Sequence, residues 1–312
     1  MLDWIRAHTG ASHARRGERL QSLWSGYGEI VRVHLEGAAA DCVILKRVAP
    51  PQDAMHPRGW SSDRSHERKL RSYEVEAAFY RKYAARSAAR VPRCLATEAH
   101  DNGWWFLLED LDDAGFAGRR RNVDDVELGR CVDWLADFHA GFLGTAADPL
   151  WPIGTYWHLE TRPDELAAMP DGPLRDAAAA LDAALSRARH QTLVHGDAKL
   201  ANFCFADDAV AAVDFQYTGR GCGMKDVAYL LSCLPEHRCA ASADAVLDRY
   251  FARLRRSLPS TTDADALETE WRALYPVAWA DFERFLCGWA PSHPKRHGYA
   301  ARLTERALES LM

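Results

Sequence analysis

The sequence predicts an α+β fold in two lobes, in which a small antiparallel-sheet lobe with one helix precedes a larger, mainly helical lobe. Strand-like alternation of apolar and polar residues runs from about Tyr27 to Leu45, and a short apolar run covers 103–111. One helical pattern separates these two regions, and helical patterns dominate after Asp112. We therefore expect an N-terminal lobe over residues 1–111 and a C-terminal lobe over residues 112–312.

The elements of the first lobe follow from local patterns. The segments GEIVRVHLEG and CVILKRV alternate as strands, with the small polar loop AAAD between them. Residues 63–84 are predicted to form one helix, because Tyr73, Tyr80 and other apolar residues recur at spacings of three and four. The segment GWWFLLEDL is typical of a short buried strand that ends in acidic residues.

The second lobe is predicted to be helical apart from one hairpin. In the segment NFCFADDAVAAVDF the turn ADD separates two apolar runs, which indicates paired strands. Apolar residues at helical spacing predict helices over five segments: 124–143, 173–188, 223–234, 241–257 and 262–289.

Composition excludes several classes of protein. The 312 residues include 39 basic and 44 acidic side chains, and the formal net charge of −5 argues against nucleic acid as a partner. We expect no membrane partner, because no stretch is apolar enough to span a bilayer, and charges occupy the N-terminus where a signal peptide needs an apolar core. The eight cysteines include no CxxC pair, so reduced thiols and a cytoplasmic location are expected. The oligomeric state stays open.

The clearest chemical pattern is LVHGDAKLANFCF at 193–205, in which Asp197 and Asn202 precede a strand. A second acid, Asp214, ends the returning strand, so a hairpin would bring it back beside Asn202. Two carboxylates and an amide in this order suit phosphoryl transfer, where catalysis is mostly positioning and neutralisation of charge. Asp197 would orient a substrate hydroxyl and accept its proton, and Asn202 and Asp214 would supply oxygens to Mg²⁺.

A lysine and a glutamate could hold a nucleotide. Lys46 ends the apolar strand VILK, either as a solvated strand end or as an ammonium that reaches phosphates. On the following helix, Glu76 shares a face with Phe79 and Tyr80, so it should point to the core and need a cation. Glu74 lies on a more polar face. We therefore expect Glu76, rather than Glu74, to pair with Lys46.

Two backbone segments are weaker candidates for nucleotide contacts. Ser25, Gly26 and Gly28 precede a strand, and glycines let backbone N–H groups approach phosphates, although an ordinary hairpin turn fits the same residues. Backbone groups from Glu109 to Leu111 could bind the edge of an adenine, or could simply connect the two lobes.

The order of these motifs resembles the protein-kinase-like small-molecule phosphotransferases, which include aminoglycoside and choline kinases. The resemblance covers residue 22 to the C-terminus, and EDL, DFQ and GWAPSHPK are most similar to the ecdysteroid-kinase-like branch. It implies a kinase fold, ATP, Mg²⁺, Asp197 as catalytic base, Asn202 and Asp214 as metal ligands, and Lys46 with Glu76 as a phosphate clamp. It also implies that Asp226 braces the catalytic loop, that the first lobe binds nucleotide, and that the second binds the acceptor.

Two details bear on the type of kinase. Lys199 follows Asp197 by two residues, where it could neutralise charge on the γ-phosphate or could be a solvated loop lysine. Only FQYTGRGCGMK separates Asp214 from Asp226, which leaves little room for an activation loop, and no APE motif follows. The short segment and the lack of an APE motif both argue against a protein substrate.

The sequence therefore predicts an ATP- and Mg²⁺-dependent kinase that phosphorylates a hydroxyl of a small molecule. The alternatives are an aminoglycoside-type antibiotic phosphotransferase and a catalytically silent nucleotide-binding protein. The aromatic stripe over 271–289 should pack in the helical core, although Trp157 or Trp289 could instead line an acceptor site. A polycationic acceptor would need converging carboxylates, and the candidates Asp263, Asp265, Glu268 and Glu270 also suit a helix N-terminus.

Overall fold

The computed structural model describes residues 1–23, 26–50, 62–100 and 103–311, and the chain divides into two units. The first unit comprises Met1–Arg86, Arg90–Arg119 and Cys204–Gln216, and the second comprises Ser87–Ala89, Arg120–Phe203 and Tyr217–Met312. The first unit carries the antiparallel sheet and the second is mostly helical, which confirms the predicted fold class. A lobe boundary after Leu111 stays a prediction, and by contacts the segment 204–216 joins the first unit.

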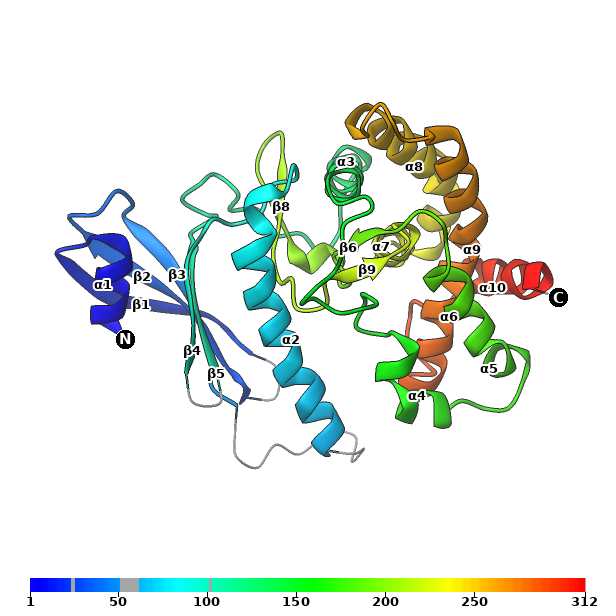
Figure 1. Ribbon diagram of the computed structural model, residues 1–312, viewed down its shortest axis with the longest axis horizontal. Helices are drawn as coiled ribbons and strands as arrows, with labels where there is room; N and C mark the ends of the chain where they lie inside the picture. The colour runs from blue at the N-terminus through cyan, green and yellow to red at the C-terminus, as the bar shows by residue number, and fades with distance from the viewer. Residues whose placement is uncertain (24–25, 51–61, 101–102, 312) are drawn as a thin grey trace. The chain divides into compact units, whose positions relative to one another are not determined.

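A five-stranded antiparallel sheet forms the centre of the first unit (Figure 1). The spatial order is β1-β2-β3-β5-β4, so β3 lies in the middle of the sheet. The strands are β1 (His13–Ser22), β2 (Gly28–Glu36), β3 (Cys42–Val48), β4 (Cys94–His100) and β5 (Gly103–Glu109). The strands expected at VILK and GWWFLLE are β3 and β5, and they pair in register with Lys46 opposite Phe106.

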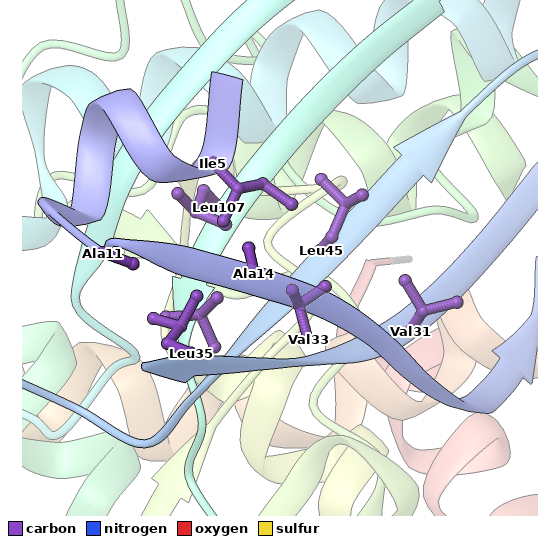
Figure 2. Close-up of a cluster of buried hydrophobic side chains, with 9 residues drawn as sticks. Ile5, Ala11, Ala14, Val31, Val33, Leu35, Leu45 and Leu107 are labelled. Carbon is purple, nitrogen blue, oxygen red and sulfur yellow. The ribbon is translucent and has the colours of Figure 1, made fainter. Parts of the chain in front are cut away.

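The sheet is covered by a helix on each face, and strand alternation decides which side chain meets which helix (Figure 1). Leu45 and Leu107 join Ile5 of helix α1 (Leu2–Thr9) in one buried cluster, which Figure 2 shows. Their neighbours Lys46 and Phe106 therefore project to the opposite face, which is covered by α2 (Ser62–Lys82). This alternation is the reason that Lys46 faces α2.

The sequence prediction missed α1, β1 and β4, so the expectation of a single helix in the first lobe was wrong. Helix α1 has one buried residue, Ile5, and a single buried position cannot produce the apolar periodicity that predicts a helix. Strand β1 pairs with β2 at the edge of the sheet, and most of its residues are exposed, with Ala14 buried. An edge strand of this kind has no apolar alternation to detect, because water covers most of it.

The hairpin expected near residue 205 is present, and its residues from Cys204 onward belong to the first unit. It consists of β7 (Phe203–Phe205) and β8 (Val210–Ala212), whose residues Cys204 and Ala211 pack against Leu111. Phe215, just after the hairpin, stacks on Phe79 of α2 with ring centroids 3.9 Å apart. The end of the hairpin is thereby fixed against α2 close to Asp214.

The second unit is built from helices around two short strands, β6 (Thr192–Val194) and β9 (Gly219–Gly221). Four of the five predicted helices occur with shifted ends, but the one predicted over 173–188 is divided at Ala177 into two helices. The strand pair β6–β9 and the helices α4 and α10 were not predicted, so the expectation that the second lobe is helical apart from one hairpin was wrong. The helices are α3 (Asp125–Gly141), α4 (Pro163–Ala167), α5 (Pro173–Asp176), α6 (Ala178–Ser186), α7 (Met224–Leu231), α8 (Glu236–Ser257), α9 (Ala264–Trp289) and α10 (Gly298–Leu311). Short 3₁₀ turns occur at Ala84–Arg86, Leu159–Thr161 and Leu200–Asn202.

Helix α9 forms the centre of this helical packing and contacts α7, α6 and α10. Its aromatic stripe is largely core, as expected: Trp271, Trp279 and Phe282 are almost fully buried, and Pro276 lies inside the helix. No helix in the described part of the chain is both long and apolar enough to cross a membrane.

Candidate active site

Lys46 lies in a buried ion pair in the first unit. Its Nζ is 2.9 and 2.7 Å from the two carboxylate oxygens of Glu76, and 3.4 Å from Oδ1 of Asp214. Lys46 and Glu76 are 4% and 1% exposed, whereas Glu74 forms a surface pair with Arg71. The structure thus brings Lys46 to Glu76 rather than to Glu74.

The charges of this pair determine one another. Burial alone lowers the pKa of Lys46, but the carboxylates of Glu76 and Asp214 outweigh it and raise that pKa above its usual value. Burial raises the pKa of Glu76, and the Lys46 ammonium opposes this shift. Lys46 is therefore a fixed cation at neutral pH, held by two carboxylates.

Two polar residues beside the pair were missed by the sequence analysis. Lys69 donates to Oε1 of Gln216 over 2.8 Å, and Lys69 Nζ lies 4.8 Å from the ring centroid of Tyr73. Ser72 also donates to Gln216 Oε1 over 3.2 Å. The signal was present, because Lys69 precedes Glu76 by two helical turns and so lies on the same face of α2.

Asp214 has a backbone conformation that few residues adopt. Its φ is +70°, in the left-handed region, where aspartate is tolerated better than most residues other than glycine. Such conformations cost free energy and tend to occur at functional positions. The Asp214 carboxylate lies at the end of the hairpin, with its Oδ1 3.4 Å from Lys46 Nζ.

In the glycine turn between β1 and β2, packing against β3 explains why residue 28 is a glycine. A Cβ on Gly28 would lie 2.0 Å from the carbonyl oxygen of Arg47, so β3 leaves no room for a side chain. Gly26 has φ +76°, and a Cβ there would meet no atom within 4 Å. Ser25 lies outside the described residues. A role of Ser25, Gly26 and Gly28 in phosphate binding stays a prediction.

The segment proposed to bind adenine has part of its backbone already engaged. The N–H of Glu109 donates to the carbonyl of Arg93, and the carbonyl of Leu111 accepts from the N–H of Phe116. The Glu109 carboxylate binds Arg90 over 2.7 Å. A contact between the backbone groups from Glu109 to Leu111 and an adenine edge stays a prediction.

Cys42, Asp110 and Asp113 also converge in the first unit. Asp110 is already engaged, because Arg32 Nε donates to its Oδ2 over 2.5 Å and the N–H of Asp112 donates to its Oδ1. We therefore treat this cluster as a structural ion-pair region rather than a metal centre.

Asp197 is the centre of the second group of polar residues. Its Oδ2 accepts hydrogen bonds from Lys199 Nζ over 2.7 Å and from Asn202 Nδ2 over 3.0 Å. Asn202 Nδ2 also donates to the Asp197 carbonyl over 2.8 Å. Asp197 is 5% exposed, and its Oδ1 is buried without a hydrogen-bond partner among the described residues. The structure thus brings Asp197, Lys199 and Asn202 together and leaves one carboxylate oxygen for a donor from outside.

Asp226 stabilises the loop that carries Asp197 by accepting hydrogen bonds from its backbone. Its carboxylate accepts the N–H of His195 over 2.6 Å and the N–H of Gly196 over 3.0 Å. His139 Nε2 lies 3.2 Å from the same carboxylate, while its Nδ1 lies 2.7 Å from the Tyr250 hydroxyl. Because a carboxylate only accepts, His139 donates from Nε2 to Asp226.

Gly196 is required in this loop for two reasons. Its φ is +81°, and a Cβ would lie 2.1 Å from the carbonyl oxygen of Tyr217. The glycine of the HGD motif therefore lets the backbone turn between His195 and Asp197.

Replacing Asp226 with alanine should destabilise the protein strongly. The change leaves the buried donors of His195, Gly196 and His139 without an acceptor, and each such group costs about 1–3 kcal/mol. We expect the free energy of unfolding, measured by urea denaturation, to fall by about 3 kcal/mol or more. Asp244→Ala, on the exposed side of α8, is the control. Equal losses in the two variants would contradict the bracing role.

The acids considered for a polycationic acceptor are engaged within the fold. Asp263 caps the N-terminus of α9 by accepting the N–H of Ala266, and Arg255 pairs with both Asp265 and Glu268. Glu270 accepts the N–H groups of Arg189 and His190. These contacts favour the structural explanation of the acidic cluster.

Trp157 and Trp289 differ in exposure. Trp157 is fully buried and donates to Asp281 over 3.0 Å, so it belongs to the core. Trp289 is partly buried and stacks on Phe285 with ring centroids 5.6 Å apart.

With this geometry established, comparison with known families decides the assignment. The model of the phosphotransferase enzyme family named APH matches residues 21–267, which is most of the chain. The chain belongs to this family. The resemblance found in the sequence motifs is thereby confirmed at the level of the superfamily, and the ecdysteroid-kinase-like branch stays a prediction. No curated protein matches the chain.

Solved structures support the fold of this phosphotransferase. A provisionally named aminoglycoside phosphotransferase from Ralstonia eutropha JMP134 has 15% identity and a TM-score of 0.54, and the match covers 99% of this chain and 94% of that one. An amicoumacin kinase in complex with AMP-PNP, Ca²⁺ and Ami has 14% identity and a TM-score of 0.55, with 100% and 96% coverage. A provisionally named fructosamine-3-kinase from Haemophilus somnus 129PT has 13% identity and a TM-score of 0.50, with 99% and 96% coverage.

Proposed function

We propose that this phosphotransferase is a kinase that uses ATP and Mg²⁺ to phosphorylate a hydroxyl of a small molecule. The observation that carries the proposal is the arrangement at Asp197. Lys199 and Asn202 donate to one carboxylate oxygen, and the other is buried with no donor among the residues that the structure describes. A carboxylate in this state can accept a hydrogen bond from an alcohol. Membership of the family supports the proposal, as does the AMP-PNP in the amicoumacin kinase neighbour.

In the proposed reaction, the acceptor hydroxyl donates its hydrogen bond to Oδ1 of Asp197. The hydroxyl oxygen forms a bond to the γ-phosphorus while the bond between that phosphorus and the bridging oxygen of ADP breaks, and the proton passes to Asp197. Lys199, 2.7 Å from Asp197 Oδ2, would place a positive charge next to the transferring group. Products are the phosphorylated alcohol and ADP.

Nucleotide binding is assigned to the first unit. Lys46 would contact phosphate oxygens while Glu76 holds its ammonium in place, and the glycine turn with Ser25, Gly26 and Gly28 would cover the phosphates. Backbone groups between Glu109 and Leu111 would bind the adenine edge.

The chemistry of each predicted ligand suits Mg²⁺. Asn202 directs its Nδ2 to two oxygens of Asp197, which leaves its Oδ1 as a ligand, and Asp214 offers a partly exposed carboxylate. Bound Mg²⁺ would neutralise phosphate charge. Asn202 and Asp214 would then orient the triphosphate through the metal.

Asp214→Asn should weaken nucleotide binding only when Mg²⁺ is present. Asparagine tolerates the left-handed backbone of this position, so the fold should persist while the charge is lost. Wild-type protein at ATP concentrations about 100 times Kd should gain roughly 2.7 kcal/mol of stability. We expect thermal-shift titrations to show a Mg²⁺-dependent gain for the wild type and a clearly smaller one for the variant. A wild type that ATP does not stabilise would refute nucleotide binding.

The other hypotheses find less support in the structure. A silent nucleotide-binding protein would not need the unpartnered oxygen of Asp197, and the acids that a polycationic antibiotic would require are engaged elsewhere. All eight cysteines are free thiols, in keeping with the proposed cytoplasmic location.

A further inference from the structure

A set of aromatic rings lies beside the catalytic loop of the second unit. We call it the aromatic wall, and it comprises Tyr156, Tyr229, Phe285 and Trp289. The N–H of Tyr156 donates to the carbonyl of Gly196 over 3.2 Å, directly before Asp197 in the chain. The Tyr156 ring centroid is 5.5 Å from that of Tyr229 and 5.4 Å from that of Phe285.

The tyrosines of the wall are close enough to Asp197 for its charge to affect their pKa values. Burial raises the pKa values of Tyr156 and Tyr229, and the Asp197 carboxylate raises both further. Tyr156 and Trp289 are partly exposed. An acceptor whose hydroxyl binds Asp197 would therefore have its remaining atoms next to this wall.

Two cations of the protein already lie over the rings of this region. The Arg162 guanidinium carbon is 5.8 Å from the Tyr156 centroid and 5.2 Å from that of Phe285. Lys295 Nζ is 4.2 Å from the Tyr229 centroid. A cationic ligand would have to compete with them for the same aromatic faces, and it would be repelled by their charge.

Lys295 differs from Arg162 in how its charge is balanced. Arg162 pairs with Glu165 over 3.0 Å. Lys295 Nζ lies 3.4 Å from Cys233 Sγ, and within the described residues no carboxylate lies in ion-pair distance of it. Its ammonium can therefore take an anionic group from a ligand.

The carboxylates near the wall are neutralised by partners of their own. Asp281 accepts from Arg284 over 2.8 Å, and Glu283 accepts from Arg296 over 2.7 Å. Burial and the charge of Lys295 lower the pKa of His293, so this imidazole is neutral at neutral pH. In the described part of the chain, Lys295 is therefore a cation over the ring of Tyr229 that no carboxylate pairs with.

We propose that the acceptor is an alcohol with a flat apolar or aromatic body and an anionic group, and that Lys295 binds that anionic group. This inference rests on the proposed function and specifies its substrate class. It excludes quaternary ammonium alcohols and polycationic antibiotics as the preferred acceptors. Lys295 is then a specificity-determining residue, and the aromatic wall holds the body of the acceptor.

Three alcohols with the same ring test the inference: 4-(hydroxymethyl)benzoate, benzyl alcohol and 4-(aminomethyl)benzyl alcohol. They are anionic, neutral and cationic at neutral pH. We expect ligand-observed NMR titrations of the wild type to give an affinity for the anion about fivefold above that for benzyl alcohol, the gain of one partly exposed ion pair. The cation should bind most weakly.

Variants at Lys295 test whether this residue causes the preference for the anionic alcohol. Lys295→Gln should reduce binding of the anion to the level of benzyl alcohol and leave benzyl alcohol itself unchanged, whereas Lys295→Arg should retain the preference. Lys82→Gln, at the exposed end of α2, is the matched control for loss of one charge. The preference should also decline as salt is added.

Binding and turnover separate this inference from the proposed function. If the anion binds best but no alcohol promotes ADP release, phosphoryl transfer fails and the inference about ligand charge stands. Equal binding of all three alcohols, binding of none, stronger binding of the cation, or an unchanged preference in Lys295→Gln would each overturn the inference, whether or not ADP is released.

Discussion

Asp197→Asn should lower kcat by about a hundredfold or more while ATP affinity stays nearly unchanged, because a general base typically contributes a factor of this size. Asparagine has nearly the same shape and can still accept a hydrogen bond from Lys199, so the loop should keep its conformation. Its amide cannot take the proton of the acceptor hydroxyl. Steady-state kinetics with varied ATP and acceptor separate the loss in kcat from changes in KM.

The control for this variant is Asp208→Asn, the same substitution on the exposed turn of the β7–β8 hairpin. It should leave kcat and ATP binding as they are in the wild type. A large loss of ATP affinity in Asp197→Asn with kcat maintained would assign Asp197 to nucleotide binding and contradict its role as base.

Glu76→Gln should lower kcat/KM for ATP by about a hundredfold, or about 2.7 kcal/mol of transition-state stabilisation. Glutamine fills the same buried space, but it offers Lys46 one acceptor oxygen in place of two and adds a donor that faces an ammonium. Lys46 would then be held mainly by Asp214, 3.4 Å away. The free energy of unfolding should also decrease, because breaking a buried pair is costly.

Glu74→Gln is a matched control on the same helix, two residues away. Glu74 forms an exposed pair with Arg71, and exposed pairs of this kind contribute little. We expect its kinetics and stability to equal those of the wild type. Similar losses in the two variants would mean that helix stability, rather than the position of Lys46, explains the effect of Glu76.

The sequence was sufficient for the parts of the fold that have a strong local pattern. The apolar strand VILK and the helix with Phe79 and Tyr80 carry periodic apolar residues, and these elements also carry Lys46 and Glu76. The HGD motif could be found because Gly196 and Asp197 are adjacent in the chain. In each case one short segment contains both the structural and the chemical signal.

Features that depend on distant segments could not be predicted. Lys69 meets Gln216, and Lys295 lies over Tyr229, although these pairs are far apart in the chain. No local pattern marks such partners, because their proximity is decided by packing. Strand β1 was missed for another reason, since its exposed edge carries too few buried residues to produce alternation.

The engagement of the acidic cluster at the start of α9 shows why composition alone could not select the acceptor. Asp265 and Glu268 suit a polycation by charge, yet Arg255 holds both of them. The charged side chains beside the aromatic wall differ in whether a carboxylate of the protein pairs with them. Arg162 is balanced by Glu165, whereas Lys295 has no carboxylate within ion-pair distance in the described part of the chain.

The most direct test of the central claim is transfer of labelled γ-phosphate from ATP by the purified protein, with a panel of small alcohols and with casein as a protein substrate. We predict that the label appears on an alcohol only when Mg²⁺ is present and that Asp197→Asn abolishes nearly all transfer. Label on casein but on no alcohol, or tight ATP binding with no transfer to any acceptor, would contradict the account.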